Sequence, residues 1–270
     1  MLAKTDTGYE YRLGDPVAEV ISADGTATNG YASVKRAFLA IDKGAVATVR
    51  LLTNTTTKEA IGVPTDATVT FDLNGKTLSG SIANGLTSDL ANFRAVIVNL
   101  GDLTVVDSSG TDAGCVYNTN TAKESETSTI VNPAIYNFQG KTLTVEGGMI
   151  GNNNYNSGSA VYNDSLAKAY VKGGKFTNHS SNGGPVFLNN ANATMEITGG
   201  TIIGTVTGWV YNFGTLSVGG TFSTRESRVR TYGIASNAGA NTTVTDGQFD
   251  LVYANITADG VPCEFVVATN

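Results

Sequence analysis

A short peptide pattern, apolar-x-apolar-x-Gly-Gly-x-apolar, recurs along this chain at near-constant spacing. It reads LTVEGGMI from Leu143, AYVKGGKF from Ala169 and MEITGGTI from Met195, so that successive copies start 26 residues apart. Looser copies follow from Leu216 and Thr242. Self-similarity at this period is typical of solenoid proteins, in which each repeat packs on the next.

The content of one repeat decides which solenoid is expected. Each unit holds two stretches of period-2 alternation separated by Gly and Asn turns, and none with helical spacing, so each repeat is predicted to be one β-coil. Successive coils then pair as parallel strands, and the usual handedness of parallel connections makes the winding right-handed. We therefore predict an all-β fold, a right-handed single-stranded parallel β-helix with a short N-terminal capping helix.

Stacking coils converts sequence position into columns of side chains. The asparagine column is predicted to be an internal ladder, because an amide both donates and accepts hydrogen bonds and can satisfy its copies above and below. Its expected members are Asn137, Asn163, Asn189 and Asn212, with Asn74, Asn99 and Asn237 at compatible spacing. Two buried apolar columns are expected beside it: Val145, Val171, Ile197, Val218 and Val244, and Ile150, Phe176, Ile202, Phe222 and Phe249.

These coils resemble the pectate-lyase-like right-handed parallel β-helices, especially bacterial surface proteins built from coils with Gly-Gly turns. The segments VTFDLNGKTLSG from Val69 and AVIVNLGDLTVVDSSG from Ala95 are similar to the opening coils of those proteins. The resemblance covers roughly residues 30–250. It implies the fold but not one activity, since such coils serve lyases, hydrolases, esterases, adhesins and carbohydrate-binding modules.

One structural domain with three parts is expected. Residues 1–65 form the N-terminal cap and first strands, residues 66–250 the coils, and residues 251–270 a C-terminal cap or last strand. An open solenoid end exposes apolar core, so a cap is needed. The segment SVKRAFLAID from Ser33 places apolar residues on one helical face, with Ser33 as the N-cap, and predicts the capping helix. The segment 118–131 is expected to form a side loop.

Composition agrees with an extracellular origin, and the resemblance implies a bacterial surface or secreted protein. The chain has 32 glycines, 15% charged residues and a net charge of −6, which disfavours nucleic acid as a partner. No stretch resembles a membrane span, and the N-terminus lacks a signal peptide, so an exported protein would be represented here by a fragment of a larger surface protein. Cys115 and Cys263 lie about five coils apart and are expected to be unpaired.

The columns do not bring carboxylates together, which disfavours catalysis. Uronate lyases and glycosidases need converging or facing carboxylates, whereas one outward column contains Glu196 alone and the next pairs Glu146 with Lys172. The lone histidine, His179, lies in a predicted turn. We expect no catalytic residue, no metal and no cofactor. A calcium site at turn aspartates is the alternative left open; the aspartates are Asp107, Asp112, Asp246 and Asp250.

Aromatic residues are the main candidates for ligand binding. If the asparagines point inward, alternation turns Tyr136, Tyr162 and Tyr211 outward, with Leu188 between them and Trp209 beside Tyr211. Such an exposed stripe would offer apolar faces with polar tips to sugar rings. The alternatives are a side loop that covers the stripe, or reversed alternation. A second candidate is the basic cluster Arg225, Arg228 and Arg230, which suits acidic polysaccharides or is a solvated loop.

Three functions follow in order of preference. The first is a noncatalytic surface β-helix that binds a polysaccharide or a host or cell-surface glycan, as a carbohydrate-binding or adhesion module. The second is a polysaccharide lyase or hydrolase acting on uronic-acid polymers. The third is a purely structural stalk. The ligand and the neighbouring domains are not indicated by the sequence.

Overall fold

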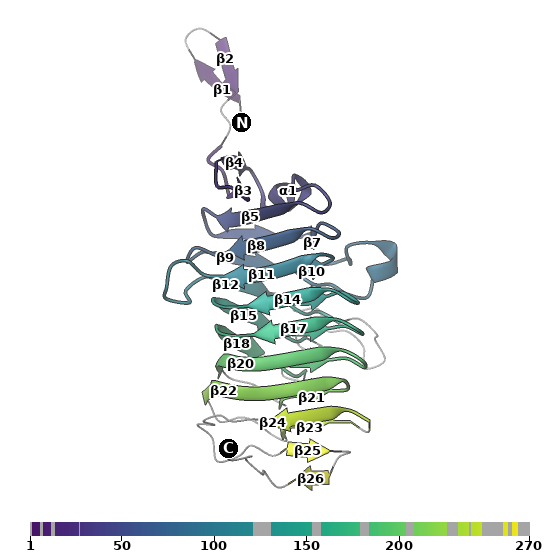
Figure 1. Ribbon diagram of the computed structural model, residues 1–270. Coiled ribbons are helices and arrows are strands. Elements are labelled where there is room, and N and C mark those ends of the chain that lie inside the picture. Colours follow the sequence, from purple (N-terminus) through teal and green to yellow (C-terminus); the bar gives the residue numbers. More distant parts are fainter. Residues whose placement is uncertain are drawn as a thin grey trace.

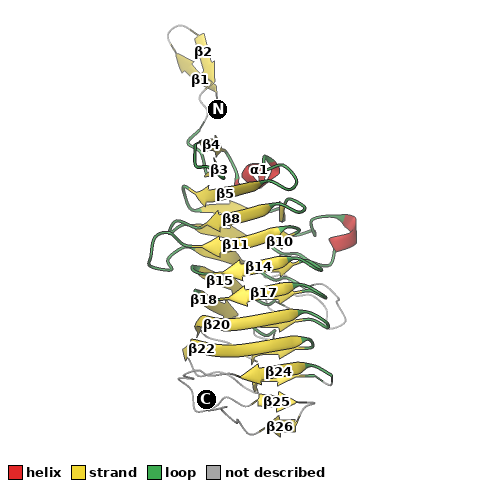
Figure 2. Cartoon of the chain, in the orientation of Figure 1, coloured by secondary structure: helices red, strands yellow, loops and turns green. Residues whose placement is uncertain are grey.

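The chain folds into a tall stack of short strands, with its N-terminal cap at the top of Figure 1. The computed structural model describes residues 2–5, 8–11, 14–26, 28–120, 131–152, 158–178, 184–203, 208–225, 232–237, 239–244, 256–258 and 261–263. Among these residues, strands make up nearly all of the regular structure (Figure 2). The prediction of an all-β fold with largely parallel strands is confirmed.

Most strands belong to three parallel ladders that run along the stack. The first ladder contains β5 (Val46–Leu51), β8 (Thr68–Asp72), β11 (Asp102–Val106), β14 (Thr142–Val145), β17 (Lys168–Val171), β20 (Thr194–Ile203), β22 (Thr215–Arg225) and β24 (Asn241–Val244). The second contains β6 (Thr55–Thr57), β9 (Thr77–Gly80), β12 (Cys115–Asn118), β15 (Met149–Asn152) and β18 (Lys175–Asn178). The third contains β7 (Ile61–Val63), β10 (Ile97–Asn99), β13 (Ile135–Asn137), β16 (Val161–Asn163), β19 (Phe187–Asn189), β21 (Gly208–Asn212), β23 (Tyr232–Ser236) and β25 (Ile256–Ala258).

The ladders form two large sheets. The long strand β20 pairs with both β17 and β18, and so joins the first and second ladders into one 15-stranded sheet. The third ladder forms a nine-stranded sheet, in which β26 (Val261–Cys263) pairs antiparallel with β25. The coils that begin with β5, β8, β11, β14 and β17 thus contribute one strand to each ladder, which gives the molecule its solenoid-like architecture.

The asparagine column forms the predicted internal ladder. Asn137, Asn163 and Asn189 are paired in register in the third ladder and are fully buried. The Nδ2 atom of Asn137 donates to Oδ1 of Asn163 at 2.8 Å, and Asn163 donates to Asn189 at 2.8 Å. Asn99 and Asn212 extend the column at its two ends. Each buried amide therefore satisfies its neighbour, which is the requirement for polar groups inside a coil.

Two asparagines expected in this ladder lie elsewhere. Asn74 lies in the turn between β8 and β9 with φ at 49°, and its amide donates to the carbonyl of Leu51. At the C-terminal side, Ser236 pairs with Asn212, and Asn237 is the exposed residue after it. Asn237 is one position past the column, whereas the column position one coil before Asn99 is taken by Val63 rather than by Asn74.

The Gly-Gly turns explain the repeat from which the fold was predicted. The second glycines have φ in the left-handed region, for example 92° at Gly174, where a side chain would be strained. A Cβ atom at Gly174 would also lie 2.7 Å from the carbonyl oxygen of Gly148, one coil earlier. Stacking therefore favours glycine at this corner of the coils that contain Gly148, Gly174 and Gly200.

The N-terminal cap covers part of the first coil. The helix α1 (Val34–Leu39) begins as predicted, with the Ser33 hydroxyl accepting from the backbone N–H of Arg36 at 3.3 Å. Its buried face, formed by Val34, Ala37 and Phe38, packs toward the core. The antiparallel strands β3 (Ala18–Ser22) and β4 (Thr28–Tyr31) cover β5, while the hairpin of β1 (Leu2–Thr5) and β2 (Gly8–Tyr11) forms a separate sheet.

The core columns largely follow the repeat. Val145, Val171, Ile197 and Val218 are buried and in register, and Val244 follows them half-buried. The second column holds for Ile150, Phe176 and Ile202, but its extension to Phe222 is wrong. A register shift between β20 and β22 pairs Phe222 with Gly200, because β22 advances from Val218 to Thr221 while β20 advances only from Ile197 to Gly199. This is the one extra residue of a β-bulge. Phe249 lies outside the described residues.

Candidate functional site

The outward column of the third ladder is the site expected from the sequence. Register pairs Tyr136 with Tyr162, Tyr162 with Leu188, and Leu188 with Tyr211. Because the neighbouring asparagines point into the coil, alternation turns these four side chains away from it. The predicted order of the column is confirmed, and its exposure differs from residue to residue.

Tyr136 does not belong to an exposed surface, which corrects the prediction. The segment between β9 and β10 projects from the side of the stack (Figure 1), includes η1 (Ser88–Leu90), and carries Phe93. The ring of Phe93 stacks on that of Tyr136 with centroids 4.1 Å apart and planes 19° apart, and Tyr136 is 1% exposed. The side segment covers this end of the column because stacking an aromatic pair there buries two large apolar surfaces.

Trp209 is also buried, at 2% exposure, and forms part of the continuous hydrophobic core. Alternation in β21 predicted its outward direction but not whether the ring is accessible. A binding role for an exposed Trp209 ring is therefore wrong.

Tyr162, Leu188 and Tyr211 remain partly exposed and form what we call the lateral strip. At its covered end, the ring of Phe93 packs edge-on against Tyr162 with centroids 5.6 Å apart. The strip thus continues from the covered Tyr136 toward the C-terminal coils, with one residue from each of three successive coils.

Two polar side chains lie beside the lateral strip at the ends of their strands. The Asn190 amide donates to Oδ1 of Asp164 at 3.1 Å and to the Tyr162 hydroxyl at 3.3 Å, while Tyr136 donates to Oδ2 of Asp164 at 2.7 Å. Burial, followed by the charge of Asp164, raises the pKa of Tyr162, and burial also raises that of Tyr136. Both phenols therefore stay protonated at neutral pH and serve as hydrogen-bond donors next to a carboxylate acceptor.

The side chains of the basic cluster Arg225, Arg228 and Arg230 are not among those that the structure describes. Arg225 is the last residue of β22, and its side chain is not described. Arg228 and Arg230 lie outside the described residues, so their role as a site for acidic polysaccharides stays a prediction. His179, Asp246 and Asp250 also lie outside them.

The aspartates expected in turns have structural partners. Asp107 accepts from the backbone N–H groups of Gly75 and Gly114, both at 2.7 Å, and Asp112 accepts from that of Gly148 at 3.0 Å. Burial alone would raise the pKa of Asp107, but these amide hydrogen bonds outweigh it and hold the pKa below the usual value. In the described residues, no three His, Cys, Asp or Glu side chains gather in a metal-binding group.

The Asp107 carboxylate should make stability fall in acid. Because its pKa is lower in the folded than in the unfolded chain, its contribution is complete above the unfolded value of about 3.9 and is lost as the pH falls through the folded value. We expect Asp107→Asn to reduce the difference in unfolding free energy between about pH 7 and about pH 2.5, measured by urea denaturation. Asp89→Asn, at an exposed side-segment residue, is the matched control. An unchanged pH difference in Asp107→Asn would contradict this role.

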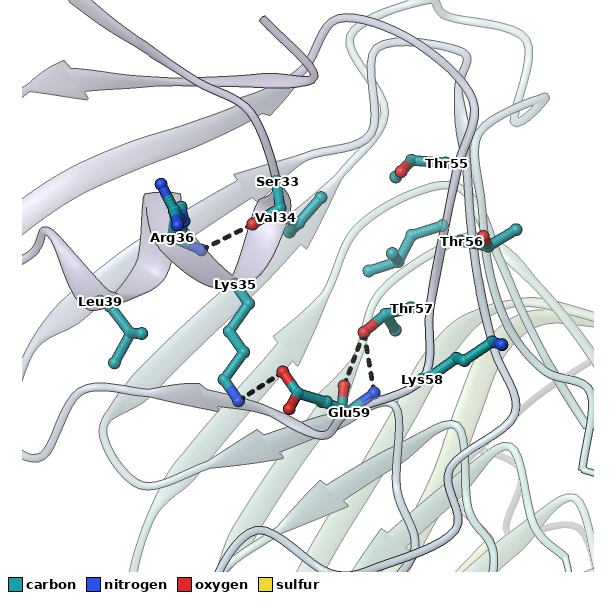
Figure 3. Close-up of a pocket in the computed structure, with 11 residues that line it drawn as sticks. Ser33, Val34, Lys35, Arg36, Leu39, Thr55, Thr56, Thr57, Lys58 and Glu59 are labelled. Atoms are coloured by element: carbon teal, nitrogen blue, oxygen red, sulfur yellow. Dashed lines mark hydrogen bonds and ion pairs between the residues drawn. The ribbon is translucent and has the colours of Figure 1, made fainter. Parts of the chain in front are cut away.

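A groove near the N-terminal end of the stack was not predicted from the sequence. It lies between α1 and β6, has a volume of about 460 Å³, and includes Val34 and Leu78 in its lining (Figure 3). Across the groove, the Nζ atom of Lys35 forms an ion pair with Oε2 of Glu59 at 2.8 Å. The Thr-rich stretch 55–57 and the basic residues on α1 were the available signals, but nothing in the sequence places them opposite each other.

A second asparagine column was also missed. Asn118, Asn152 and Asn178 are in register in the second ladder and are buried. Their amides donate to carbonyls at the entry to the third ladder, for example Asn118 to Pro133 at 2.9 Å and Asn178 to Gly184 at 2.7 Å. The spacing of 26 residues between Asn152 and Asn178 was a signal for this column, and it is structural.

No match emerges from comparing the chain with protein-family models, with curated proteins or with solved structures. The proposed function therefore rests on the residues of this chain. Cys115 is a free thiol that is buried, and burial raises its pKa to about 12, so it is unreactive at neutral pH; the side chain of Cys263 is not described. No helix in the described ranges has the length and apolar character needed to cross a membrane.

Proposed function

We propose that this chain is a noncatalytic carbohydrate-binding or adhesion module of a bacterial surface protein, and that the lateral strip contacts the glycan. The observation that carries the proposal is the strip itself: Tyr162, Leu188 and Tyr211 are partly exposed on successive coils, beside Asp164 and Asn190. Aromatic and aliphatic faces suit the apolar faces of sugar rings, while the carboxylate and amide suit hydroxyl groups.

As part of this proposal, we take the fold to be a right-handed single-stranded β-helix of the pectate-lyase-like kind, and the arrangement of the strands supports that. In Figure 1 the first-ladder strands point left across the front, and each coil returns behind them before the next strand lies one step lower. We take the winding to be right-handed, because connections between parallel strands strongly favour that hand. A rigid stack of this kind also suits an extracellular location, where it would hold a binding face away from the cell.

Replacing Tyr162 by alanine should weaken glycan binding about 5- to 30-fold, because loss of an aromatic contact costs about 1–2 kcal/mol. The measurement is a glycan array followed by titration of the best polysaccharide by calorimetry. Tyr170→Ala is the matched control, since Tyr170 is a partly exposed tyrosine in the first ladder, away from the strip.

Two results would reject the binding role of the strip. Equal weakening by Tyr162→Ala and Tyr170→Ala would place the glycan elsewhere. No binding of wild-type protein to plant, microbial or host polysaccharides would leave a structural stalk, whereas release of unsaturated uronate or reducing ends would show the lyase or hydrolase alternative.

A further inference from the structure

The N-terminal edge of the second ladder is left open. In the first ladder, β5 is covered by the antiparallel strand β3, and in the third ladder α1 packs against β7. In contrast, β6 ends the 15-stranded sheet and pairs with β9 and with no other described strand. An edge strand carries main-chain groups with no partner in the sheet, and can accept another strand.

The free edge of β6 is centred on Thr56. The carbonyl of Thr57 accepts from the backbone N–H of Ser81 at 3.2 Å, so the main-chain groups of Thr57 face β9. Since these groups alternate in direction along a strand, the N–H and C=O of Thr56 face away from β9. The side chain of Thr56 is exposed. This residue therefore offers one donor and one acceptor to an added strand.

A groove of suitable form lies along this edge. Between α1 and β6 it has a volume of about 460 Å³, and the exposed side chain of Leu39 gives it an apolar part (Figure 3). This is the place that a further strand of the second ladder would occupy, next to β6, if the stack continued by another coil. The fold thus leaves room for one extended segment where its own chain provides none among the described residues.

The charges around the groove select the kind of segment. Its lining includes three basic residues, Lys35, Arg36 and Lys58, against one acidic residue, Glu59, whereas the whole chain has a net charge of −6. The carboxylate of Glu59 is already paired with Lys35, which leaves Arg36 and Lys58 as exposed positive groups at the rim. Short edge strands flanked by lysine resist pairing with apolar strands, so a partner must bring complementary charge.

We propose that this groove binds an extended acidic peptide segment of a partner protein, which adds to β6 as an edge strand. Main-chain hydrogen bonds to Thr56 give the pairing, and Arg36 and Lys58 give the preference for acidic side chains. The proposal goes beyond glycan binding, because the groove lies at the capped end of the stack and shares no residue with the lateral strip.

The test uses a fluorescein-labelled peptide of alternating glutamate and valine, titrated into the full chain and followed by fluorescence anisotropy. Saturable binding is expected, weakening as salt is raised. Thr56→Pro should abolish it, because proline lacks the N–H that faces the groove while the ladder to β9 is kept. The double variant Arg36→Glu with Lys58→Glu should weaken it at least about fivefold, from two exposed charge pairs. Lys168→Glu, at an exposed lysine in the first ladder, should not change it.

A second form of the peptide keeps the test decisive if Thr56→Pro does not fold. Methylation of alternate backbone nitrogens removes the main-chain donors of the probe and should abolish binding to the wild-type chain. The proposal is overturned if the wild type shows no saturation up to about 1 mM peptide, or if the methylated and unmethylated forms bind equally. Equal binding of a lysine-valine peptide would also overturn it. A concentration-dependent dimer that excludes the peptide would show that a second copy of the chain occupies the groove instead.

Discussion

Replacing Asn163 by alanine is expected to lower the free energy of unfolding by about 3–5 kcal/mol, because several buried hydrogen bonds are lost at about 1–3 kcal/mol each. The Asn163 amide accepts from Asn137 and donates to Asn189, each at 2.8 Å, and donates to the carbonyl of Thr194 at 2.9 Å. Alanine leaves the Asn189 oxygen and the Thr194 carbonyl without this donor inside the coil. Urea denaturation followed by circular dichroism measures the change.

Two further variants distinguish the effect of losing the ladder's hydrogen bonds from the effect of losing side-chain volume. Asn163→Asp keeps the shape but replaces the amide donor with a buried acid, so it should lose at least as much stability at neutral pH. Asn241→Ala removes an exposed asparagine side chain in the first ladder and should change stability by less than about 0.5 kcal/mol. If Asn163→Ala and Asn163→Asp both fell within that smaller range, the internal ladder would not be a stabilising element.

Replacing Phe176 by alanine should cost about 3–5 kcal/mol through the cavity that it leaves in the core. Phe176 is 0% exposed, and the centroid of its ring lies 4.7 Å from that of Phe187. Ile150 and Ile202 pair with it from the two neighbouring coils. Because backbone pairing on both sides fixes the coils, the surrounding structure can collapse little into the space. The loss should appear as a lower urea midpoint with little change in slope.

Phe213→Ala is the matched control for the core. Phe213 is 37% exposed, so removing its ring should cost much less than removing that of Phe176. Equal losses in the two variants would mean that the column of Ile150, Phe176 and Ile202 is not a packed core.

The repeat made the central coils predictable because it fixes register. Once successive copies are spaced by 26 residues, Asn137, Asn163 and Asn189 must stack, and the chemistry of the amide indicates that the column is internal. The same register, with alternation along the strands, predicted the outward direction of Tyr162 and Tyr211. At Phe222 it failed, because β22 carries one extra residue in a bulge, at a position that spacing does not reveal.

The non-periodic segments could not be placed in the same way. Nothing in the residues around Phe93 indicates that this side segment folds back on Tyr136, since a loop has no register to fix its direction. The groove beside β6 was missed for a related reason. It exists because the cap covers β5 and β7 and leaves β6 open, and this depends on tertiary packing of α1 rather than on a pattern in the Thr-rich segment.

A crystal structure would test most directly whether neighbouring coils bring matched residues together. The account predicts parallel strands in which the amides of Asn137, Asn163 and Asn189 form one buried column at hydrogen-bonding distance, with Val145, Val171 and Ile197 stacked beside it. Two antiparallel sheets packed face to face, with these asparagines separated or exposed to solvent, would contradict it.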